Sequence, residues 1–258
     1  MDVKPKKRLG QHFLKNEDIA LQIVEAVKTP QANVLEIGPG MGVLTKYLLQ
    51  QPFASFSVIE LDEESVDYLQ QNFSQLGSNL IAGDFLKLDL ASKFGYPLVV
   101  MGNFPYNISS QILFKVLDHK DLAVEVVGMF QKEVAERIAA APGKKQYGIL
   151  SVLLQAFYDV EYLFTVQETE FLPPPKVKSA VVRLTRNPEK KLHCDEELFR
   201  KVVKTAFNYR RKTLHNALQS LSFPAEVAND PIFTKRAEQL SVQDYEYLCG
   251  LLQRPDNK

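Results

Sequence analysis

The sequence of 258 residues, with a mass of 29.3 kDa, is long enough for one large domain with a small appendage. Hydrophobic residues make up 45% and charged residues 24%, close to the globular average, which excludes a disordered, collagen-like or fibrous chain. The 31 basic and 31 acidic residues leave no net charge, so any nucleic-acid partner has to be bound by local basic patches.

Cysteine usage and hydropathy bear on the compartment. The two cysteines, Cys194 and Cys249, lie far apart in the sequence and form no CxxC pair, so neither a metal site nor a disulfide framework is expected. No apolar run reaches the ~20 residues that span a bilayer, and no signal-peptide core follows the basic N-terminus. We therefore predict a cytoplasmic protein with no metal and no membrane association.

From about residue 16 to residue 186, short apolar runs alternate with segments of helical period, which is typical of an α/β domain with a mainly parallel sheet. Nearly continuous apolar strands indicate that helices cover both faces of the sheet. The expected strands are residues 33–38, 56–61, 79–84, 97–103 and 123–130. The expected crossover helices are residues 43–50, 64–73 and 108–119.

The C-terminal third of the chain changes character. Residues 160–167 and 180–186 alternate as an antiparallel strand pair would, and the polar segment 187–193 then marks a boundary. Three helices are expected beyond it, at residues 195–207, 209–221 and 241–254, the last opened by a Ser241–Asp244 capping box. The predicted architecture is a Rossmann-like α/β domain, residues 1–188 with a basic arm at 1–15, followed by a small all-α domain, residues 189–258.

The strongest local motif is the glycine turn after the first strand. Gly38, Gly40 and Gly42 follow a strand and open a helix, where glycines allow close approach of a ligand and the helix offers unpaired N–H groups. Glu60 ends the second strand, where an acidic residue accepts hydrogen bonds from ribose hydroxyls. Together these features predict a ligand that contains a nucleoside.

The neighbouring residues favour one nucleoside cofactor. Val43 stands where a dinucleotide fingerprint needs its third glycine, which disfavours a nicotinamide dehydrogenase. Glu36 lies inside an apolar strand, and a buried carboxylate is costly unless it is paired. S-adenosylmethionine, which carries a sulfonium and an ammonium, fits better than an anionic pyrophosphate. Asp84, just after the third strand, can accept from its adenine amine, with Phe85 as an apolar neighbour.

A second motif, at residues 102–110, ends the fourth strand, where ligands bind in open α/β sheets. Methyl transfer to the 6-amino group of adenine requires hydrogen-bond acceptors on the amine protons. Asn103 offers a side-chain carbonyl, and the proline after Phe104 favours a non-helical backbone that can turn a second carbonyl toward the site. Tyr106 can stack on the purine, which is worth ~1–3 kcal/mol per base.

In order and spacing these segments resemble the ribosomal RNA adenine dimethyltransferase family, the bacterial small-subunit dimethyladenosine transferases in particular. Two positions depart from the family pattern, because His12 stands where Asn is more frequent and Phe104 where Leu is more frequent. The matching segments, which extend over nearly the entire chain, are residues 7–14, 36–42, 58–62, 83–86, 102–109, 171–181 and 206–218.

The resemblance implies an S-adenosylmethionine-dependent methyltransferase sheet and assigns roles to individual residues. For the cofactor, it places His12 and Leu14 at the methionine end with Gly38 beneath it, and Glu60, Asp84 and Asn103 at the ribose, the adenine and the reactive end. For the target adenine, it implies a site made by Asn103, Pro105 and Tyr106, with Phe171 stacking on the opposite face.

Local charge favours an RNA partner. The stretch from Arg183 to Lys212 contains ten basic and four acidic residues, so it is locally basic although the whole chain has no net charge. We expect two groups of residues to reach phosphates: Arg210, Arg211 and Lys212 at the start of a helix, and Lys7 and Arg8, beside Lys4 and Lys6, on the N-terminal arm. Single-stranded or loop RNA is favoured, because its bases can enter a pocket.

The resemblance implies an enzyme that dimethylates the 6-amino groups of two adjacent adenosines in a loop near the 3′ end of small-subunit (16S) ribosomal RNA, acting on immature 30S subunits. We expect the protein to be a monomer. Two alternatives stay open. One is a methyltransferase acting on large-subunit RNA. The other is a ribosome-assembly binding factor whose catalysis is incidental.

Overall fold

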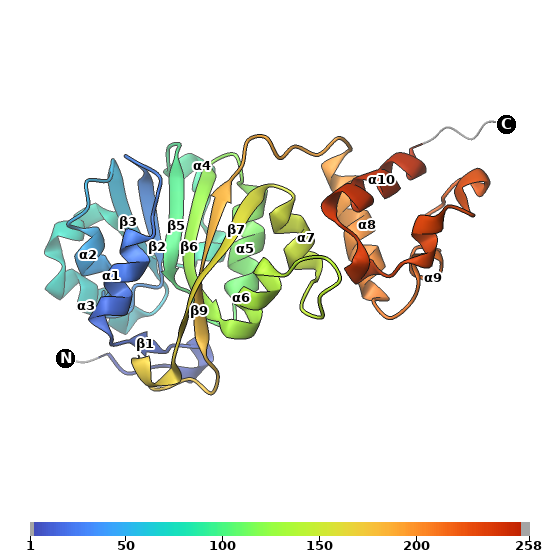
Figure 1. The fold of residues 1–258 in the computed structure, drawn as a ribbon. Coiled ribbons are helices and arrows are strands. Elements are labelled where there is room, and N and C mark those ends of the chain that lie inside the picture. The colour runs from blue at the N-terminus through green and yellow to red at the C-terminus, as the bar shows by residue number, and fades with distance from the viewer. Residues whose placement is uncertain (1–2, 254–258) are drawn as a thin grey trace. The chain divides into compact units, whose positions relative to one another are not determined.

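The computed structural model describes residues 3–253 (Figure 1). The chain forms two compact units: residues up to Ala135 with Asp159–Arg186, and Glu136–Tyr158 with the residues from Asn187 onwards. The predicted boundary after residue 188 leaves residues 136–158 in the first domain, whereas their contacts group them with the C-terminal helices. The first two residues of the predicted arm and residues 254–258 of the predicted helical domain lie outside the described residues.

The first unit is built on a seven-stranded sheet in the order β4-β3-β2-β5-β6-β9-β7. Strands β2 to β6 run parallel to one another, and β9 runs antiparallel to β6. The five predicted parallel strands are confirmed, and β7 and β9 pair as neighbours. The strands are β2 (Asn33–Ile37), β3 (Ser55–Glu60), β4 (Leu80–Ala82), β5 (Leu98–Asn103), β6 (Ala123–Gln131), β7 (Tyr158–Val166) and β9 (Ser179–Arg186).

The strand order contains a reversal that determines where a ligand can bind. The chain moves outward from β2 to β3 and β4, then returns to place β5 on the other side of β2. Open α/β sheets bind ligands at the carboxyl ends of the strands beside such a reversal. The glycine turn after β2 and the turn after β5 therefore lie side by side.

Helices cover the sheet, as the apolar strands predict (Figure 1). Side chains alternate along each strand, so Val99 and Met101 of β5 pack with Ile23 of α1 and Leu48 of α2 in one core cluster, while Val100 is buried on the opposite face. The helices of this unit are α1 (Glu17–Glu25), α2 (Thr45–Leu48), α3 (Glu63–Asn72), α4 (Leu90–Lys93) and α5 (Ser109–Asp118), and α6 (Lys132–Ala139) leads into the second unit.

Short elements complete the first unit. An antiparallel ladder joins β1 (Phe13–Leu14) to β8 (Phe171–Leu172), so the N-terminal arm is paired with a segment that lies more than 150 residues further along the chain. The 3-10 turns of the chain are η1 (Lys7–Leu9), η2 (Ser74–Asn79), η3 (Phe85–Lys87), η4 (Glu168–Glu170), η5 (Ala225–Val227), η6 (Pro231–Thr234) and η7 (Ala237–Gln239).

The second unit is helical, as predicted. Helix α7 packs against α8 and α10, and the rings of Phe199 and Tyr245 meet edge to face in the core. The predicted capping box is confirmed, because the Ser241 hydroxyl accepts from the Asp244 amide and the Asp244 carboxylate accepts from the Ser241 amide. The helices are α7 (Ile149–Gln155), α8 (Glu196–Asn208), α9 (Leu214–Ala217) and α10 (Val242–Leu252).

The predicted helix over residues 209–221 is wrong in its extent. Only Leu214–Ala217 is helical, and residues 209–212 form the turn between α8 and α9. Thr213 has an extended backbone and pairs with Arg236, and the Leu214 amide donates to the Lys235 carbonyl at 2.8 Å. This pairing keeps the backbone extended at Thr213, so the helix that local periodicity favours does not form before Leu214.

Two kinds of feature are absent from residues 3–253. No helix there is long and apolar enough to cross a membrane. Nor does that part of the chain bring together three or more His, Cys, Asp or Glu side chains that could hold a metal ion.

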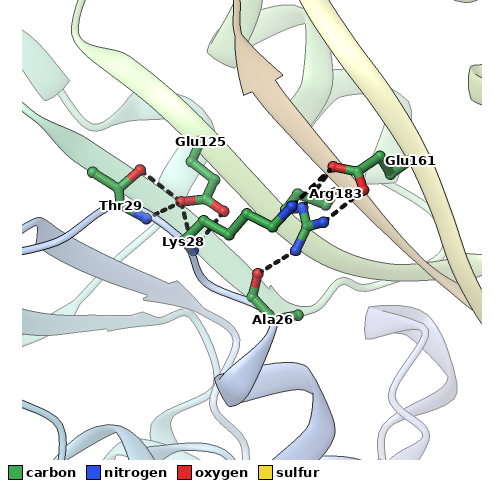
Figure 2. A network of polar contacts seen from close by, with 6 residues as sticks. All are labelled: Ala26, Lys28, Thr29, Glu125, Glu161 and Arg183. Atoms are coloured by element: carbon green, nitrogen blue, oxygen red, sulfur yellow. Dashed lines mark hydrogen bonds and ion pairs between the residues drawn. The ribbon is translucent and has the colours of Figure 1, made fainter.

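A network of charged residues, of which Glu125 and Arg183 are buried, fastens the end of α1 to the sheet (Figure 2). The Glu125 carboxylate on β6 is completely buried and accepts hydrogen bonds from the Lys28 and Thr29 amides, at 2.9 and 2.8 Å, and from the Thr29 hydroxyl at 2.6 Å. Beside it, Arg183 of β9 binds Glu161 through two parallel hydrogen bonds and donates to the Ala26 carbonyl. The network lies at the edge of the sheet where the parallel strands begin, away from the ligand-binding edge.

Replacing Glu125 by Gln is expected to lower the free energy of unfolding by about 1–3 kcal/mol, because the amide would place a donor against amides and a hydroxyl that donate. Urea unfolding measures this loss. Glu25→Gln, at an exposed position on α1, serves as the control and should change stability little. An unchanged midpoint in Glu125→Gln would contradict the role of the network.

Candidate active site

A cavity opens at the carboxyl ends of β2, β3, β4 and β5, where the strand order predicts a ligand. Its volume is about 920 Å³, including space that is open to solvent. Four segments and the N-terminal arm contribute its walls. The lining residues are Leu9, Gly10, Gln11, His12, Phe13, Ile37, Gly38, Gly40, Ile59, Glu60, Leu61, Gly83, Asp84, Phe85, Leu86, Asn103, Phe104, Pro105, Tyr106, Asn107 and Ile108.

The glycine turn forms the floor of this cavity. Gly38 and Gly40 have φ values of 65° and 58°, which side-chain-bearing residues rarely adopt. A Cβ atom at Gly40 would lie 2.7 Å from the ring of Phe13 in the N-terminal arm. Glycine at position 40 therefore permits both the turn and the close packing of the arm over it.

Glu60, at the end of β3, is held in place by backbone amides from two turns. Its Oε2 accepts from the Gly40 amide at 3.0 Å, and its Oε1 accepts from the Leu61 and Asp62 amides at 2.8 and 2.9 Å. Burial raises the pKa of Glu60, and the three amides act against that rise. Oε2, which accepts only one of these bonds, still has acceptor capacity for a ligand hydroxyl.

Glu36 lies at the end of β2 beside a smaller adjoining cavity. That cavity is lined in part by Leu14 and Met41 and shares Phe13, Gly38 and Asn103 with the main one. The Glu36 carboxyl accepts from the Thr45 hydroxyl at 2.7 Å. Burial is the main cause that raises its pKa to about 8, and the nearby Glu60 charge acts in the same direction. Burial therefore favours the protonated form of Glu36 in the ligand-free protein.

The turn after β4 contributes Asp84 and Phe85. Asp84 caps η3, its Oδ1 accepting from the Leu86 amide at 2.9 Å, and its carboxylate lines the cavity. Phe85 is 3% exposed and forms part of the same wall. The predicted neighbours therefore lie together at one end of the cavity, with Glu60 between them and the glycine turn.

Asn103, at the end of β5, lines both cavities. Its side-chain Nδ2 donates to the His12 backbone carbonyl at 2.8 Å. Because that bond fixes the nitrogen end of the amide, the carbonyl oxygen is the end available to a ligand amine. His12 therefore contacts Asn103 through its backbone carbonyl. The residue type at position 12 could not predict this contact, because every residue has such a carbonyl.

Tyr106 stands between the N-terminal arm and β9. Its ring stacks on His12, with ring centres 5.4 Å apart, and its hydroxyl is hydrogen-bonded to Ser179. His12 Nδ1 in turn lies 2.8 Å from the Pro173 carbonyl oxygen. One face of Tyr106 is thus covered by His12. Pro105 lies in the cavity wall beside Gly38.

Phe104 fills the space beneath this turn. Its ring is buried, meets Phe130 edge to face, and occupies the position where a Cβ atom at Gly128 would project. The Phe104 ring, which stands where the family more often has Leu, has room because residue 128 is glycine.

Phe171 lies outside the set of residues that line the main cavity. It is 1% exposed, pairs with Leu14 across the β1–β8 ladder, and belongs to the core cluster. Leu14, also buried, reaches the smaller cavity beside Glu36. The structure therefore brings Leu14 to the predicted site, whereas Phe171 is packed behind the wall of the cavity.

The N-terminal arm makes contacts that sequence patterns did not predict. Lys6 pairs with Asp62 and lies 3.1 Å from Glu64, and the Gln11 side chain reaches Asp62 at 3.5 Å. The segment between them, which lines the cavity, is thereby held beside the end of β3. Lys7 and Arg8 are exposed in η1. No local sequence motif predicts these contacts, because each joins residues that are far apart in the sequence.

The second unit gathers basic residues from three segments, which we call the basic cluster. The Arg210 guanidinium donates to the Lys145 carbonyl, and the pairing of Thr213 with Arg236 brings a third segment alongside. Six of its seven members are exposed and Arg210 is half-buried. The basic cluster consists of Lys144, Lys145, Arg210, Arg211, Lys212, Lys235 and Arg236.

Comparison with known proteins gives the family. Residues 3–249 match the family model described as ribosomal RNA adenine dimethylase. The chain belongs to this family. It is 58% identical, over 98% of its own length and 95% of the relative's, to the ribosomal RNA small subunit methyltransferase A of Parabacteroides distasonis.

Solved structures agree with membership of the ribosomal RNA adenine dimethylase family. A dimethyladenosine transferase from Plasmodium falciparum is 29% identical, with a TM-score of 0.75 over 91% of this chain and 94% of that one. The 23S rRNA methyltransferase ErmE, at 23% identity, shares the fold, with a TM-score of 0.67 over 92% of this chain and 99% of that one. The predicted family, the methyltransferase class of enzyme and the Rossmann-like fold are confirmed.

The raised pKa of Glu36 predicts a pH-dependent stability for this family member. Between the ordinary glutamate value of 4.5 and about 8, the folded protein holds a proton that the unfolded chain releases. The contribution of Glu36 to the free energy of unfolding is therefore fully present below pH 4.5 and is lost as the pH rises toward 8. The raised pKa of Glu60 acts in the same direction.

Urea unfolding of the ligand-free protein at pH 5, 6.5 and 8 measures this loss. Glu36→Gln, which has no proton to release, should show a shallower decline than the wild type and should be relatively more stable at pH 8. Equal slopes in both proteins would contradict the buried, protonated state of Glu36.

Proposed function

We propose that this ribosomal RNA adenine dimethylase transfers methyl groups from S-adenosylmethionine to the 6-amino groups of two adjacent adenosines in a loop near the 3′ end of small-subunit (16S) ribosomal RNA. One observation carries the proposal. The Asn103 amide, anchored through its nitrogen by the His12 carbonyl, presents an acceptor oxygen at the cavity that also contains the carboxylates of Glu60 and Asp84.

The chemistry of the cavity walls fits the cofactor. Glu60, already oriented by three amides, would accept from the ribose hydroxyls, and Asp84 from the adenine amine beside the apolar Phe85. Acidic groups also suit the cationic methionine end. The residues that would hold that end are His12, Leu14, Glu36, Gly38, Gly40 and Asn103.

When bound, S-adenosylmethionine supplies an electrophilic methyl carbon. Asn103 Oδ1 and the Phe104 carbonyl would accept from the amine protons of the target adenine, which leaves the nitrogen lone pair directed at that carbon. Tyr106 and Pro105 would receive the purine ring. No strong general base is needed, because the proton of the methylated amine can depart to water after transfer.

Phe171 keeps its proposed place on the opposite face of the target adenine. Because it is buried against Leu14, that role depends on how the β1–β8 ladder is arranged around bound RNA. Leu172, its neighbour in β8, is 59% exposed. The β1–β8 ladder therefore has an exposed apolar side chain directly beside Phe171.

RNA docking is assigned to two basic surfaces. The basic cluster of the second unit, with Arg210, Arg211 and Lys212 at its centre, offers phosphate contacts from three segments. Lys7 and Arg8 supply exposed charge on the arm that lines the cavity. We propose that the protein acts as a monomer on immature 30S subunits in the cytoplasm.

The direct test incubates the protein with S-adenosylmethionine labelled in its methyl group and with ribosomal subunits that lack the modification. Label should enter small-subunit RNA and be recovered after digestion as N6,N6-dimethyladenosine at two adjacent positions. Preferential labelling of large-subunit RNA would overturn the choice of substrate. Binding to small subunits without any label would support the assembly-factor alternative instead.

Replacing Asn103 by Ala is expected to lower the rate of methyl transfer roughly a hundredfold or more, because an oriented acceptor is lost at the reacting amine. The affinity for small subunits, measured by sedimentation, should stay close to that of the wild type. A variant that methylates at the wild-type rate would show that Asn103 does not receive the target amine.

Replacing Arg211 by Gln should weaken binding to small subunits and reduce the slope of log affinity against log salt by about one, because one phosphate contact is lost. The affinity for S-adenosylhomocysteine should be unchanged. Lys204→Gln, at an exposed position on α8 outside the basic cluster, is the matched control. Equal slopes for Arg211→Gln and the wild type would remove Arg211 from the RNA interface.

A further inference from the structure

Three carbonyl oxygens of one short turn converge on the ammonium group of Lys115. Lys115, on α5, donates to the carbonyls of Phe85 at 2.8 Å and Leu86 at 3.0 Å, and also to that of Leu88. A lysine ammonium has three donors, so the turn that carries η3 takes up all of them. Helix α5 is thereby fastened to the turn that follows β4.

One peptide unit connects Lys115 to the wall of the cavity. The carbonyl of the Phe85–Leu86 peptide accepts from Lys115, and the N–H of the same peptide donates to Asp84 Oδ1 at 2.9 Å. Because a peptide unit is planar and rigid, fixing its carbonyl fixes the direction of its N–H. Lys115 therefore orients the group that holds the Asp84 carboxylate, although it is not among the residues that line the cavity.

Charge and ring contacts also hold the Lys115 ammonium at the η3 turn. Burial lowers the pKa of Lys115, and the charges of Asp84 and Asp89 oppose this by favouring the ammonium form. The ammonium also lies 5.2 Å from the centre of the Phe85 ring, a cation–π contact that holds a second wall residue. Helix α5 starts directly after the turn that carries Asn103 and Tyr106, and Ser109 at its start donates to the Tyr106 carbonyl at 3.3 Å.

We propose that Lys115 is a positioning residue that sets the adenine-reading end of the cofactor cavity by holding Asp84 and Phe85 through the η3 turn. The inference rests on the proposed function in one respect, the reading of the cofactor's adenine amine by Asp84. It adds a residue on the helix that follows the target-adenine motif, so that one helix connects the two purine sites.

The test measures discrimination between two purines, which a general loss of stability would not alter. Calorimetry gives the affinity for S-adenosylhomocysteine and for its 6-oxo counterpart, S-inosylhomocysteine, which lacks the amine that Asp84 would accept from. In Lys115→Met the preference for the amino compound should fall roughly tenfold or more, as expected when a charged hydrogen-bond partner is displaced. Lys87→Met, at an exposed position on the same turn, should keep the wild-type preference.

Asp84→Ala separates failure of this inference from failure of the proposed function. A wild-type preference in Lys115→Met together with a lost preference in Asp84→Ala would overturn the role of Lys115 and leave that of Asp84 intact. An unchanged preference in Asp84→Ala would overturn both. Equal weakening of both ligands in Lys115→Met would show a merely structural role. If Lys115→Met does not fold, Lys115→Gln, which retains a donor for one carbonyl, is measured instead and should also show a reduced preference.

Discussion

The Glu60 carboxylate joins the two turns on which the whole site is built. Amides from the glycine turn and from the end of β3 both donate to it, so the loops after two parallel strands are fixed relative to one another by one side chain. A carboxylate in that position is buried and yet keeps acceptor capacity toward the cavity. Because a buried carboxylate needs hydrogen-bond or charge partners, the three amides hold the glycine turn rigidly against the end of β3. For the same reason, the cavity favours ligand groups that are hydroxyls or cations.

The remaining walls are added by segments that are distant in the sequence. The arm before α1 crosses the glycine turn, fixes Asn103 through the His12 carbonyl and covers Tyr106 with the His12 ring. The β1–β8 ladder and the Lys6–Asp62 pair hold that arm in place. The cofactor site and the target-adenine site thus share a wall, which explains how a donor carbon and an acceptor amine come to adjoin each other.

Sequence alone gave the parts of the site that lie at strand ends. Glu60, Asp84 and Asn103 each follow an apolar run, and parallel strands bring their carboxyl ends to one edge, so their proximity was predictable. Lys115 was not, because it sits on a regular helix and its partners are backbone carbonyls, which leave no trace in residue type. The helix predicted over residues 209–221 failed for a related reason, because pairing with Arg236 outweighs local periodicity.

A crystal structure with S-adenosylhomocysteine would show whether the cavity at the strand ends binds the nucleoside. We expect density for the ligand in the cavity at the carboxyl ends of β2 to β5, with its ribose hydroxyls on the Glu60 carboxylate, its adenine amine against Asp84 and its sulfur beside Asn103. Density for the nucleoside outside this cavity, or with the ribose turned away from Glu60, would contradict it.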